Sequence, residues 1–408
     1  MGAALALRQR VLSWTVSDNA VNRLGRYLLS PSVFRVAIAG YLLVVFAERV
    51  LLFSGGSNDD NEQLLYSQSL EPGYGLRNPP LYTWLVVAFT HMFGAHLAAV
   101  LAVKFLLLGG TFFALLKVAK LMAADAAWAT AAAAAPLGMY ILAWDAALNF
   151  SGSVLLICVC VATFWCLLEI ERTGRFGWYA ALGLSIGAGC LTKYNYLIFC
   201  GALFIAAMFD AGFRRRLRNW RTAALAVAVP LVLPFALFAF GHAGTPGQFG
   251  AAPVVGKALP VPYAAAMSLR QTAAFAFDFL SPLLLLLPAF FPAACRPRPA
   301  DLPPALRLVG RMLAIQLAAF LLYFFFAYAS GFGTAAIHRH LFFVFILAPL
   351  WFIARASWIN RFAPALPYFA AALAALAVLA PVALAVKALA GPVLERRPTM
   401  HVPYAALA

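Results

Sequence analysis

The feature that most constrains this chain is a series of apolar stretches, each about as long as a helix that crosses a bilayer. A crossing helix needs about 20 apolar residues and satisfies all of its own backbone hydrogen bonds. Hydrophobic residues make up 64% of the chain and charged residues only 11%, whereas soluble domains carry about 25% charged residues. The pattern predicts an all-α polytopic membrane protein in one membrane domain over residues 1–408, and it excludes a soluble globular enzyme.

We expect about eleven transmembrane helices, some of them short enough to require tilting or local thinning of the bilayer. Their predicted ranges are Val33–Leu52, His96–Val118, Trp128–Ala143, Ser151–Leu168, Trp178–Leu191, Tyr196–Phe209, Thr222–Gly241, Leu280–Ala294, Leu308–Tyr328, Leu341–Ile353 and Pro364–Leu389.

The net charge of +16 is distributed in a way that predicts membrane orientation. Lys and Arg gather around residues 8–35, 117–120, 172–175, 214–221, 296–311 and 355–361, which the expected spans place on one side. Positive loops face the cytoplasm, so we predict a cytoplasmic amphipathic N-terminus (1–32), which lacks the pattern of a cleavable signal peptide, and a periplasmic C-terminus. We expect membrane lipids as partners and no nucleic acid.

The first external loop, residues 53–95, carries an acidic cluster of Asp59, Asp60 and Glu62. Carboxylates beside a membrane are costly unless they meet water, a cation or a substrate, and one of them could serve as a general base. The alternative is local, with Asp59 capping a helix and Glu62 closing a capping box. The acidic residues alone leave both interpretations open.

Two further features mark the external loops. Pro79-Pro80 breaks any preceding helix, and Leu81–Phe93 predicts a new helix that is too short for a comfortable crossing and suits the membrane surface. The second long stretch, residues 242–279, is rich in Gly and Pro and is expected to be a mobile loop.

The first loop resembles the signature of glycosyltransferase family 39, the dolichyl-phosphate-mannose–protein mannosyltransferase-like group, which includes bacterial lipid A aminoarabinose and galacturonic acid transferases. The resemblance is carried by Asp59-Asp60, Tyr66-Ser67, Gly73-Tyr74, Pro79-Pro80-Leu81 and Trp84-Leu85, and by the later segment Gly189–Asn195. It implies a C-type glycosyltransferase fold in a bacterial inner membrane. It also implies a polyprenyl-phosphate-linked sugar as donor and an active site at the periplasmic face.

The chain departs from the family pattern at two motif positions. Asp59-Asp60 stands where Asp-Glu is commonest, and Asn78 stands where a Lys or His often approaches the donor phosphate. The soluble C-terminal domain of larger relatives is not expected either.

The resemblance implies inverting transfer, with Asp59 as the catalytic base and Asp60 as its catalytic neighbour. Lys193 and Arg339 are the candidate donor phosphate ligands; the alternative is that they are interfacial snorkelling residues. Asp145 and Asn149 could support the acceptor, hold Asp59 or simply cap a helix. The predicted substrate-binding residues are Glu62, Tyr66, Tyr74, Asn78, Tyr82, Asp145, Asn149, Tyr194, His338 and His340.

No cofactor is expected, and metal dependence is left open. His338 and His340 flank Arg339, either as metal or phosphate ligands or as ordinary loop residues, and the cysteines lack the paired spacing of a zinc site. Lys104 lies inside an expected span and needs a partner there, which the sequence does not identify.

The leading hypothesis is a membrane glycosyltransferase that transfers a hexosyl, pentosyl or uronosyl group to lipid A, another envelope glycan, a lipid or a protein. The rival is a polytopic transporter or lipid-linked sugar flippase, which would place polar residues near the bilayer midplane. A non-catalytic scaffold would leave the residues from Asp59 to Leu85 unexplained. The expected polar groups lie outside the spans, which favours the enzyme.

Overall fold

The computed structural model describes residues 19–75, 79–242, 257–292, 302–331, 342–359 and 363–394, and these are helical with no named strand. The α-helices are α2 (Ala20–Leu28), α3 (Pro31–Leu51), α4 (Asn58–Tyr66), α5 (Leu81–Phe93), α6 (Leu97–Met122), α7 (Ala126–Ala134), α8 (Ala146–Leu148), α9 (Ser151–Thr173), α10 (Phe176–Cys190), α11 (Tyr196–Met208), α12 (Ala211–Leu217), α13 (Ala228–Gly241), α14 (Val261–Leu280), α15 (Leu283–Phe290), α16 (Pro304–Ser330), α18 (Leu347–Ser357) and α19 (Leu366–Leu394). Short 3₁₀ or π turns are η1 (Ala135–Gly138), η2 (Ile141–Asp145), η3 (Trp220–Val227), η5 (Phe342–Phe345) and η6 (Ala363–Ala365). The all-α prediction is confirmed.

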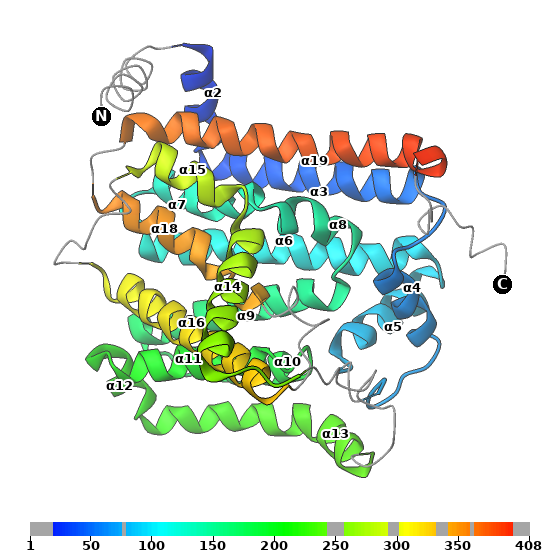
Figure 1. The fold of residues 1–408 in the computed structure, drawn as a ribbon, viewed down its shortest axis with the longest axis vertical. Coiled ribbons are helices and arrows are strands. Elements are labelled where there is room, and N and C mark those ends of the chain that lie inside the picture. The colour runs from blue at the N-terminus through cyan, green and yellow to red at the C-terminus, as the bar shows by residue number, and fades with distance from the viewer. Residues whose placement is uncertain are drawn as a thin grey trace.

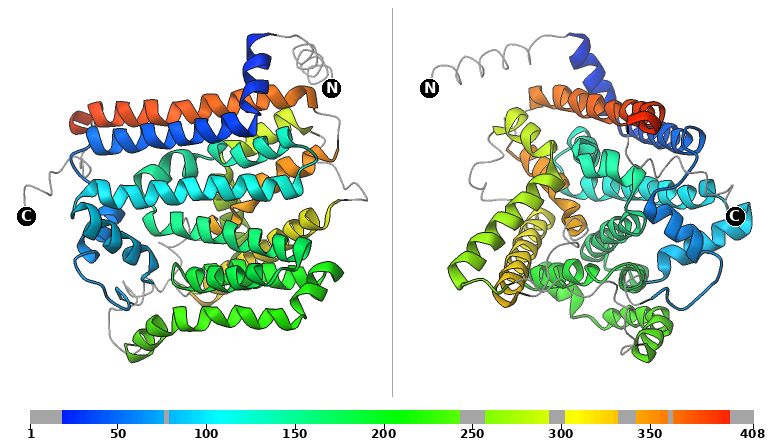
Figure 2. Two further views of the ribbon diagram at one scale, coloured as in Figure 1. Left: turned by 180° about the vertical axis from the view of Figure 1, so that it is seen from behind. Right: turned by 45° about the vertical axis from the view of Figure 1, so that its right-hand side comes forward.

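The long helices run roughly side by side across the molecule (Figure 1). α3 and α19 lie along one edge, α13 lies along the opposite edge, and α6 and α9 lie between them with mostly buried surfaces. The short helices α4 and α5 sit at the end of the bundle where α19 finishes, whereas α2 and α12 lie at the other end (Figure 2). That end with α4 and α5 is the one that the charge pattern predicts to face the periplasm.

Only some of the expected spans form helices that are long and apolar enough to cross a membrane. Within the described residues, five helices are long and apolar enough to cross, and up to seven are if two bent pairs each count as one span. One bent pair is α2 with α3, at 89°, and the other is α11 with α12, at 111°. Other expected spans, such as α10 and α18, form shorter apolar helices.

Two of the expected ranges are wrong in detail. The expected span Trp128–Ala143 is divided into α7, η1 and η2, because Pro136 cannot donate a backbone hydrogen bond inside a helix. The expected span Leu280–Ala294 forms only the eight residues of α15 within the described part of the chain. Its Pro282 precedes the helix and Pro288 lies inside it.

The prediction of a mobile loop over 242–279 is wrong for the second half of that stretch, because Val261–Leu280 forms α14. The four glycines of the stretch and two of its four prolines lie in 243–256, outside the described residues, whereas 261–280 contains six residues of Ala, the strongest helix former. Pro262 stands at the first turn of α14, where its missing N–H costs nothing.

Candidate active site

The acidic helix α4 begins with a capping box. The Ser57 hydroxyl accepts a hydrogen bond from the Asp60 N–H, and the Ser57 N–H donates to Asp60 Oδ2, each at 3.2 Å. The sequence-based alternative, a cap by Asp59 closed by Glu62, is wrong because the cap lies two residues earlier. Asp60 therefore occupies the inward position of the first turn, and Asp59 is left for another role.

Asp60 is completely enclosed, with 0% of its surface exposed. Lys104 Nζ lies 2.6 Å from Asp60 Oδ1, Arg49 Nη2 lies 3.0 Å from Oδ2, and the Ser151 hydroxyl donates to Oδ1 at 3.0 Å. Asp60 is thus the partner that Lys104 requires, and it ties α4 to α3, α6 and α9. The expectation that Asp60 is catalytic is not supported, because its oxygens are occupied and no substrate can reach them.

We predict that this buried ion cluster makes part of the free energy of unfolding sensitive to acid. Burial alone would raise the pKa of Asp60, but Lys104 and Arg49 overcome burial and lower the pKa below its ordinary value. A lowered pKa contributes stability above the ordinary carboxyl pKa of about 4 that is lost as pH falls through the lowered value. We expect unfolding midpoints measured against pH to fall below about pH 4 in the wild type. In Asp60→Asn this acid-dependent component should be missing, and an identical pH slope in both proteins would contradict the assignment.

Asp59 has the geometry of an available base. Its side chain is half-buried, and its Oδ2 accepts a hydrogen bond of 2.7 Å from the Phe150 N–H. Within the described residues no other hydrogen bond reaches the Asp59 carboxylate. Asp59 is therefore held by the Phe150 backbone amide, and not by the side chain of Asp145 or Asn149, which was one of the sequence-based alternatives. One oxygen is therefore fixed and the other remains available to take a proton.

Phe150 places that amide by an unusual backbone conformation. It is the residue before α9 and has a left-handed conformation with φ of 62°, which few non-glycine residues adopt. Its ring is buried and packs edge-on against Phe343 at 5.2 Å between centroids. Packing therefore stabilises the turn that presents the Phe150 N–H to Asp59.

Lys193 reaches the same helix start from the turn between α10 and α11. Its Nζ donates a hydrogen bond to the Ser153 hydroxyl at 2.9 Å. The turn also accepts, through the Leu191 carbonyl, a 3.0 Å bond from the N–H of Leu81 at the start of α5. Asp59 and Lys193 are therefore brought together at the first turn of α9, although 134 positions separate them in the sequence (193 minus 59).

Three other predicted residues lie around this junction. Tyr82 on α5 is buried, with its hydroxyl near the Ser151 side chain. Asn149 directly precedes Phe150, and Tyr194 follows Lys193 with 46% of its surface exposed. Asn149, which is half-buried, and Tyr194 are accessible to a substrate, whereas Tyr82 is enclosed.

A second group of predicted residues instead stabilises the loop between α4 and α5. The Tyr66 hydroxyl donates to Glu62 Oε1 at 3.0 Å, and the rings of Tyr66 and Tyr74 stack at 5.3 Å. The Tyr74 hydroxyl donates to the Ser69 carbonyl at 2.6 Å. Glu62, Tyr66 and Tyr74 thus bond with one another or with the loop backbone rather than with Asp59.

The remaining predicted residues are distributed as follows. Asp145 is half-buried at the end of η2, beside the Tyr140 hydroxyl. Asn78, His338, Arg339 and His340 lie outside the described residues. Across the described part of the chain, no group of three or more His, Cys, Asp or Glu residues could hold a metal ion.

Sequence reasoning missed several residues of this junction. Arg49 gave a usable signal, because a charge at the end of an apolar span demands a partner. Ser151 and Ser153 gave only a weak one, as small polar residues at the start of a span. The left-handed conformation of Phe150 gave none, because the position lacks the glycine that usually indicates it.

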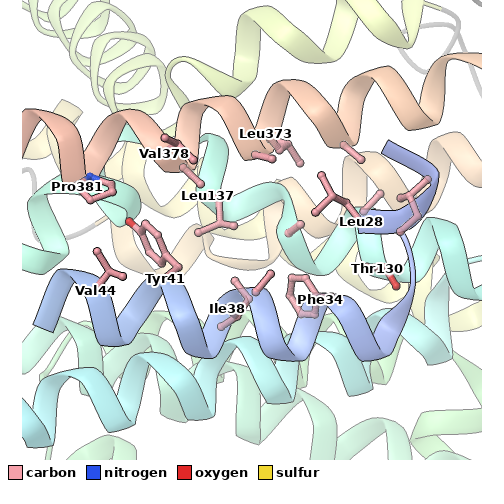
Figure 3. A pocket seen from close by; sticks show the side chains of 17 residues that line it. Leu28, Phe34, Ile38, Tyr41, Val44, Thr130, Leu137, Leu373, Val378 and Pro381 are labelled. Carbon is pink, nitrogen blue, oxygen red and sulfur yellow. The ribbon is translucent and has the colours of Figure 1, made fainter. Parts of the chain in front are cut away.

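An apolar hollow of about 440 Å³ lies elsewhere, between α3, α7 and α19 (Figure 3). Its polar groups are few, and they are occupied: the Tyr41 hydroxyl donates to the Ala143 carbonyl and the Thr130 hydroxyl to the Ala126 carbonyl. The hollow therefore offers space for an apolar chain but no reactive group.

Comparison with known proteins agrees with the resemblance of the first loop. Residues 77–238 match the family described as dolichyl-phosphate-mannose-protein mannosyltransferase. This part of the chain is similar to that family. Among curated relatives, the lipopolysaccharide core galacturonosyltransferase RgtB of Rhizobium johnstonii is 28% identical over 72% of this chain and 60% of its own length. RgtA of the same organism is 31% identical over 50% of this chain and 41% of its own length. The chain spans less than two thirds of both relatives.

Solved structures share the fold of this chain. The crystal structure of ArnT from Cupriavidus metallidurans bound to undecaprenyl phosphate matches with a TM-score of 0.64 at 15% identity, covering 89% of this chain and 79% of ArnT. The apo structure of ArnT matches with a TM-score of 0.50 at 18% identity, covering 88% of this chain and 77% of ArnT. The expected C-type glycosyltransferase fold is thereby confirmed.

Proposed function

We propose that this protein is a membrane glycosyltransferase that transfers a sugar from a polyprenyl-phosphate donor to an acceptor at the periplasmic face, with inversion at the anomeric carbon. The observation that carries the proposal is the junction at the start of α9. It brings a partly exposed carboxylate, Asp59, close to a cation, Lys193. Sugar transfer from a lipid phosphate needs a base for the acceptor and a positive charge for the leaving phosphate.

In the proposed step, Asp59 acts on the acceptor and Lys193 acts on the leaving phosphate. Asp59 takes the proton of the acceptor hydroxyl as the acceptor oxygen forms a bond to the anomeric carbon from the face opposite the phosphate. The bond between the anomeric carbon and the phosphate oxygen breaks, and its electron pair leaves with polyprenyl phosphate. Lys193 stabilises the negative charge that develops on that phosphate.

We propose a galacturonic acid residue as the sugar and the lipopolysaccharide core as the acceptor, on the strength of the activities named for RgtB and RgtA. The printed ligand of ArnT, undecaprenyl phosphate, supports a lipid-phosphate carrier for the donor. The ion cluster of Lys104, Arg49 and Asp60 favours an enzyme over a transporter, because it binds α4 to the bundle and leaves these charges without exposure.

Deletion of the gene tests the function. Mass spectrometry of the envelope glycolipids should show the loss of one uronic acid residue from the lipopolysaccharide core, and wild-type protein should restore it. An unchanged glycolipid profile, together with normal abundance of the protein in the parent strain, would contradict the proposal. Loss of a different sugar would retain transferase activity but overturn the assignment of galacturonic acid.

A further inference from the structure

The apolar hollow between α3, α7 and α19 opens on the outer surface of the bundle (Figure 3). Two of its lining residues, Val44 on α3 and Val378 on α19, are 50% and 61% exposed. Its floor is closed, because Ile38 and Leu373 are only 7% and 1% exposed. Exposed apolar surface on membrane-spanning helices faces lipid, since hydrocarbon chains are as apolar as the side chains. The hollow is therefore a groove that is accessible from the bilayer.

The groove has about the depth of one leaflet. Along α3 its lining residues run from Phe34 to Val44, and these ten positions (44 minus 34) correspond to about 15 Å of helix rise. The hydrocarbon core of a bilayer is about 30 Å thick. Leu28 and Leu29 line the groove at the bend between α2 and α3, at the end of the bundle opposite α4 and α5. The groove therefore occupies the half of the membrane on the α2 side.

Small side chains keep the groove open. Six of its 17 lining residues are alanines, and they come from all three helices. Small residues usually let membrane helices approach closely, but here about 440 Å³ is left between the helices. Apolar walls without partner atoms lose dispersion contacts, so a hydrocarbon chain from the bilayer would stabilise them. Such a chain needs no polar partner, and the Tyr41 and Thr130 hydroxyls are already bonded to carbonyls.

Basic side chains lie at the outer end of this groove. Arg26 is in the last turn of α2 and Arg35 is near the start of α3, on either side of the bend, and both are exposed. Arg26 donates to the Asn22 amide oxygen at 2.9 Å, and Arg35 donates to the Pro31 carbonyl at 3.2 Å. In the part of the chain that the structure describes, neither arginine forms an ion pair. Their positive charge is therefore complementary to an anionic headgroup.

α2 lies along the membrane surface beside the same opening. It is bent by 89° from α3, so it runs at right angles to the helices that cross (Figure 2). Val21, Leu24 and Tyr27 are 48%, 52% and 65% exposed, and their spacing of three positions forms one apolar stripe. A Cβ at Gly25 would overlap the backbone of Pro367, so α2 packs tightly against the start of α19. An exposed apolar stripe beside arginines is typical of an interfacial helix.

We propose that the groove and the bend between α2 and α3 form a binding site for one anionic phospholipid of the leaflet on the α2 side. An acyl chain occupies the groove, and Arg26 and Arg35 hold the headgroup phosphate. The lipid-phosphate sugar donor is not the occupant, because its proposed site at the α4–α9 junction lies at the opposite end of the bundle. The site goes beyond the proposed function and does not depend on it.

Native mass spectrometry of the full-length protein in detergent, titrated with phosphatidylglycerol, tests the groove. Ala374→Leu should weaken phosphatidylglycerol binding about tenfold, because the larger side chain keeps a few methylene groups of the acyl chain out of the groove. Ala375→Leu is the matched control, since Ala375 is the next residue of the same helix but is exposed and does not line the groove. If Ala374→Leu does not fold, Ala37→Leu fills the groove from α3, with exposed Ala39→Leu as its control.

Removal of the arginines tests the headgroup site. Arg26→Gln/Arg35→Gln should weaken phosphatidylglycerol binding about tenfold or more, because two charges beside the phosphate are lost. Phosphatidylethanolamine with the same acyl chains should bind the wild type about tenfold more weakly than phosphatidylglycerol and should not respond to the double change. Arg215→Gln, which removes an exposed arginine of α12, should change phosphatidylglycerol affinity by less than about twofold, because distant surface charges are screened by salt.

Three results would overturn the site. The first is equal affinity of the wild type for phosphatidylglycerol and phosphatidylethanolamine. The second is equal phosphatidylglycerol affinity in Ala374→Leu and Ala375→Leu. The third is displacement of phosphatidylglycerol by an equal concentration of undecaprenyl phosphate, with undecaprenyl phosphate losing affinity in Ala374→Leu, because the groove would then hold the carrier lipid. None of them touches the proposed transferase, whose test is sugar transfer and its dependence on Asp59.

Discussion

Replacing Asp59 with asparagine is expected to lower kcat for sugar transfer about 10²–10⁴-fold, the usual contribution of a positioned general base. The amide keeps an oxygen that can accept the 2.7 Å hydrogen bond from the Phe150 N–H, so the local structure should persist. It cannot accept the proton of the acceptor hydroxyl. Affinity for undecaprenyl phosphate should therefore stay near the wild-type value while turnover is lost, and steady-state kinetics with a polyprenyl-phosphate sugar measures both.

Glu71→Gln is the matched control for Asp59→Asn. Glu71 is an exposed carboxylate in the same loop region, and its contacts to Tyr74 and Trp84 use only its backbone. Its conversion to an amide should leave kcat within about twofold of wild type. Full activity of Asp59→Asn at normal membrane abundance would remove Asp59 from the mechanism. An equal loss in Glu71→Gln would instead show that activity responds to any charge change in the loop.

Asp60→Asn should produce the largest loss of stability of any single change at this junction, about 3–5 kcal/mol in the free energy of unfolding. The change leaves Lys104 and Arg49 as two buried cations without their shared carboxylate. Lys104→Met should cost less, because Asp60 then keeps Arg49 and the Ser151 hydroxyl. The double variant Asp60→Asn/Lys104→Met should recover part of the loss, because it removes one of the two unpaired cations.

Unfolding of these variants in detergent, followed by circular dichroism against denaturant, measures the order of stability. Lys117→Met provides a control on the same helix, since Lys117 is exposed and its Nζ lies 5.2 Å from the centroid of the Phe113 ring. Its change should stay within about 0.5 kcal/mol of wild type. The cluster assignment is contradicted if Asp60→Asn is as stable as Lys117→Met, or if adding Lys104→Met lowers the stability of Asp60→Asn further.

Much of the fold could be predicted because apolar length and proline position are local signals. α5 begins and ends at the residues predicted from Pro79-Pro80, and α6, α9 and α16 overlap their expected spans. The 242–279 stretch was misjudged because its Gly and Pro content, concentrated in 243–256, was averaged over a segment whose second half, 261–280, has strong helix formers. Local composition, rather than the mean over a long window, decides such a segment.

The site was harder to predict because burial depends on distant residues. Asp59 and Asp60 are adjacent in sequence, yet Asp60 is enclosed by Lys104 and Ser151, which lie 44 and 91 positions away. The capping signal of Ser57 with Asp60 at the third helical position was present in the sequence and would have indicated which carboxylate turns inward.

The position of bound undecaprenyl phosphate, determined by electron cryo-microscopy of the protein in nanodiscs, tests most directly whether the α4–α9 junction is the reaction site. The account predicts the phosphate against the first turn of α9 and beside Lys193, with Asp59 facing the space where the sugar would lie. A phosphate bound at the opposite end of the bundle, among the arginines of α12, would contradict it.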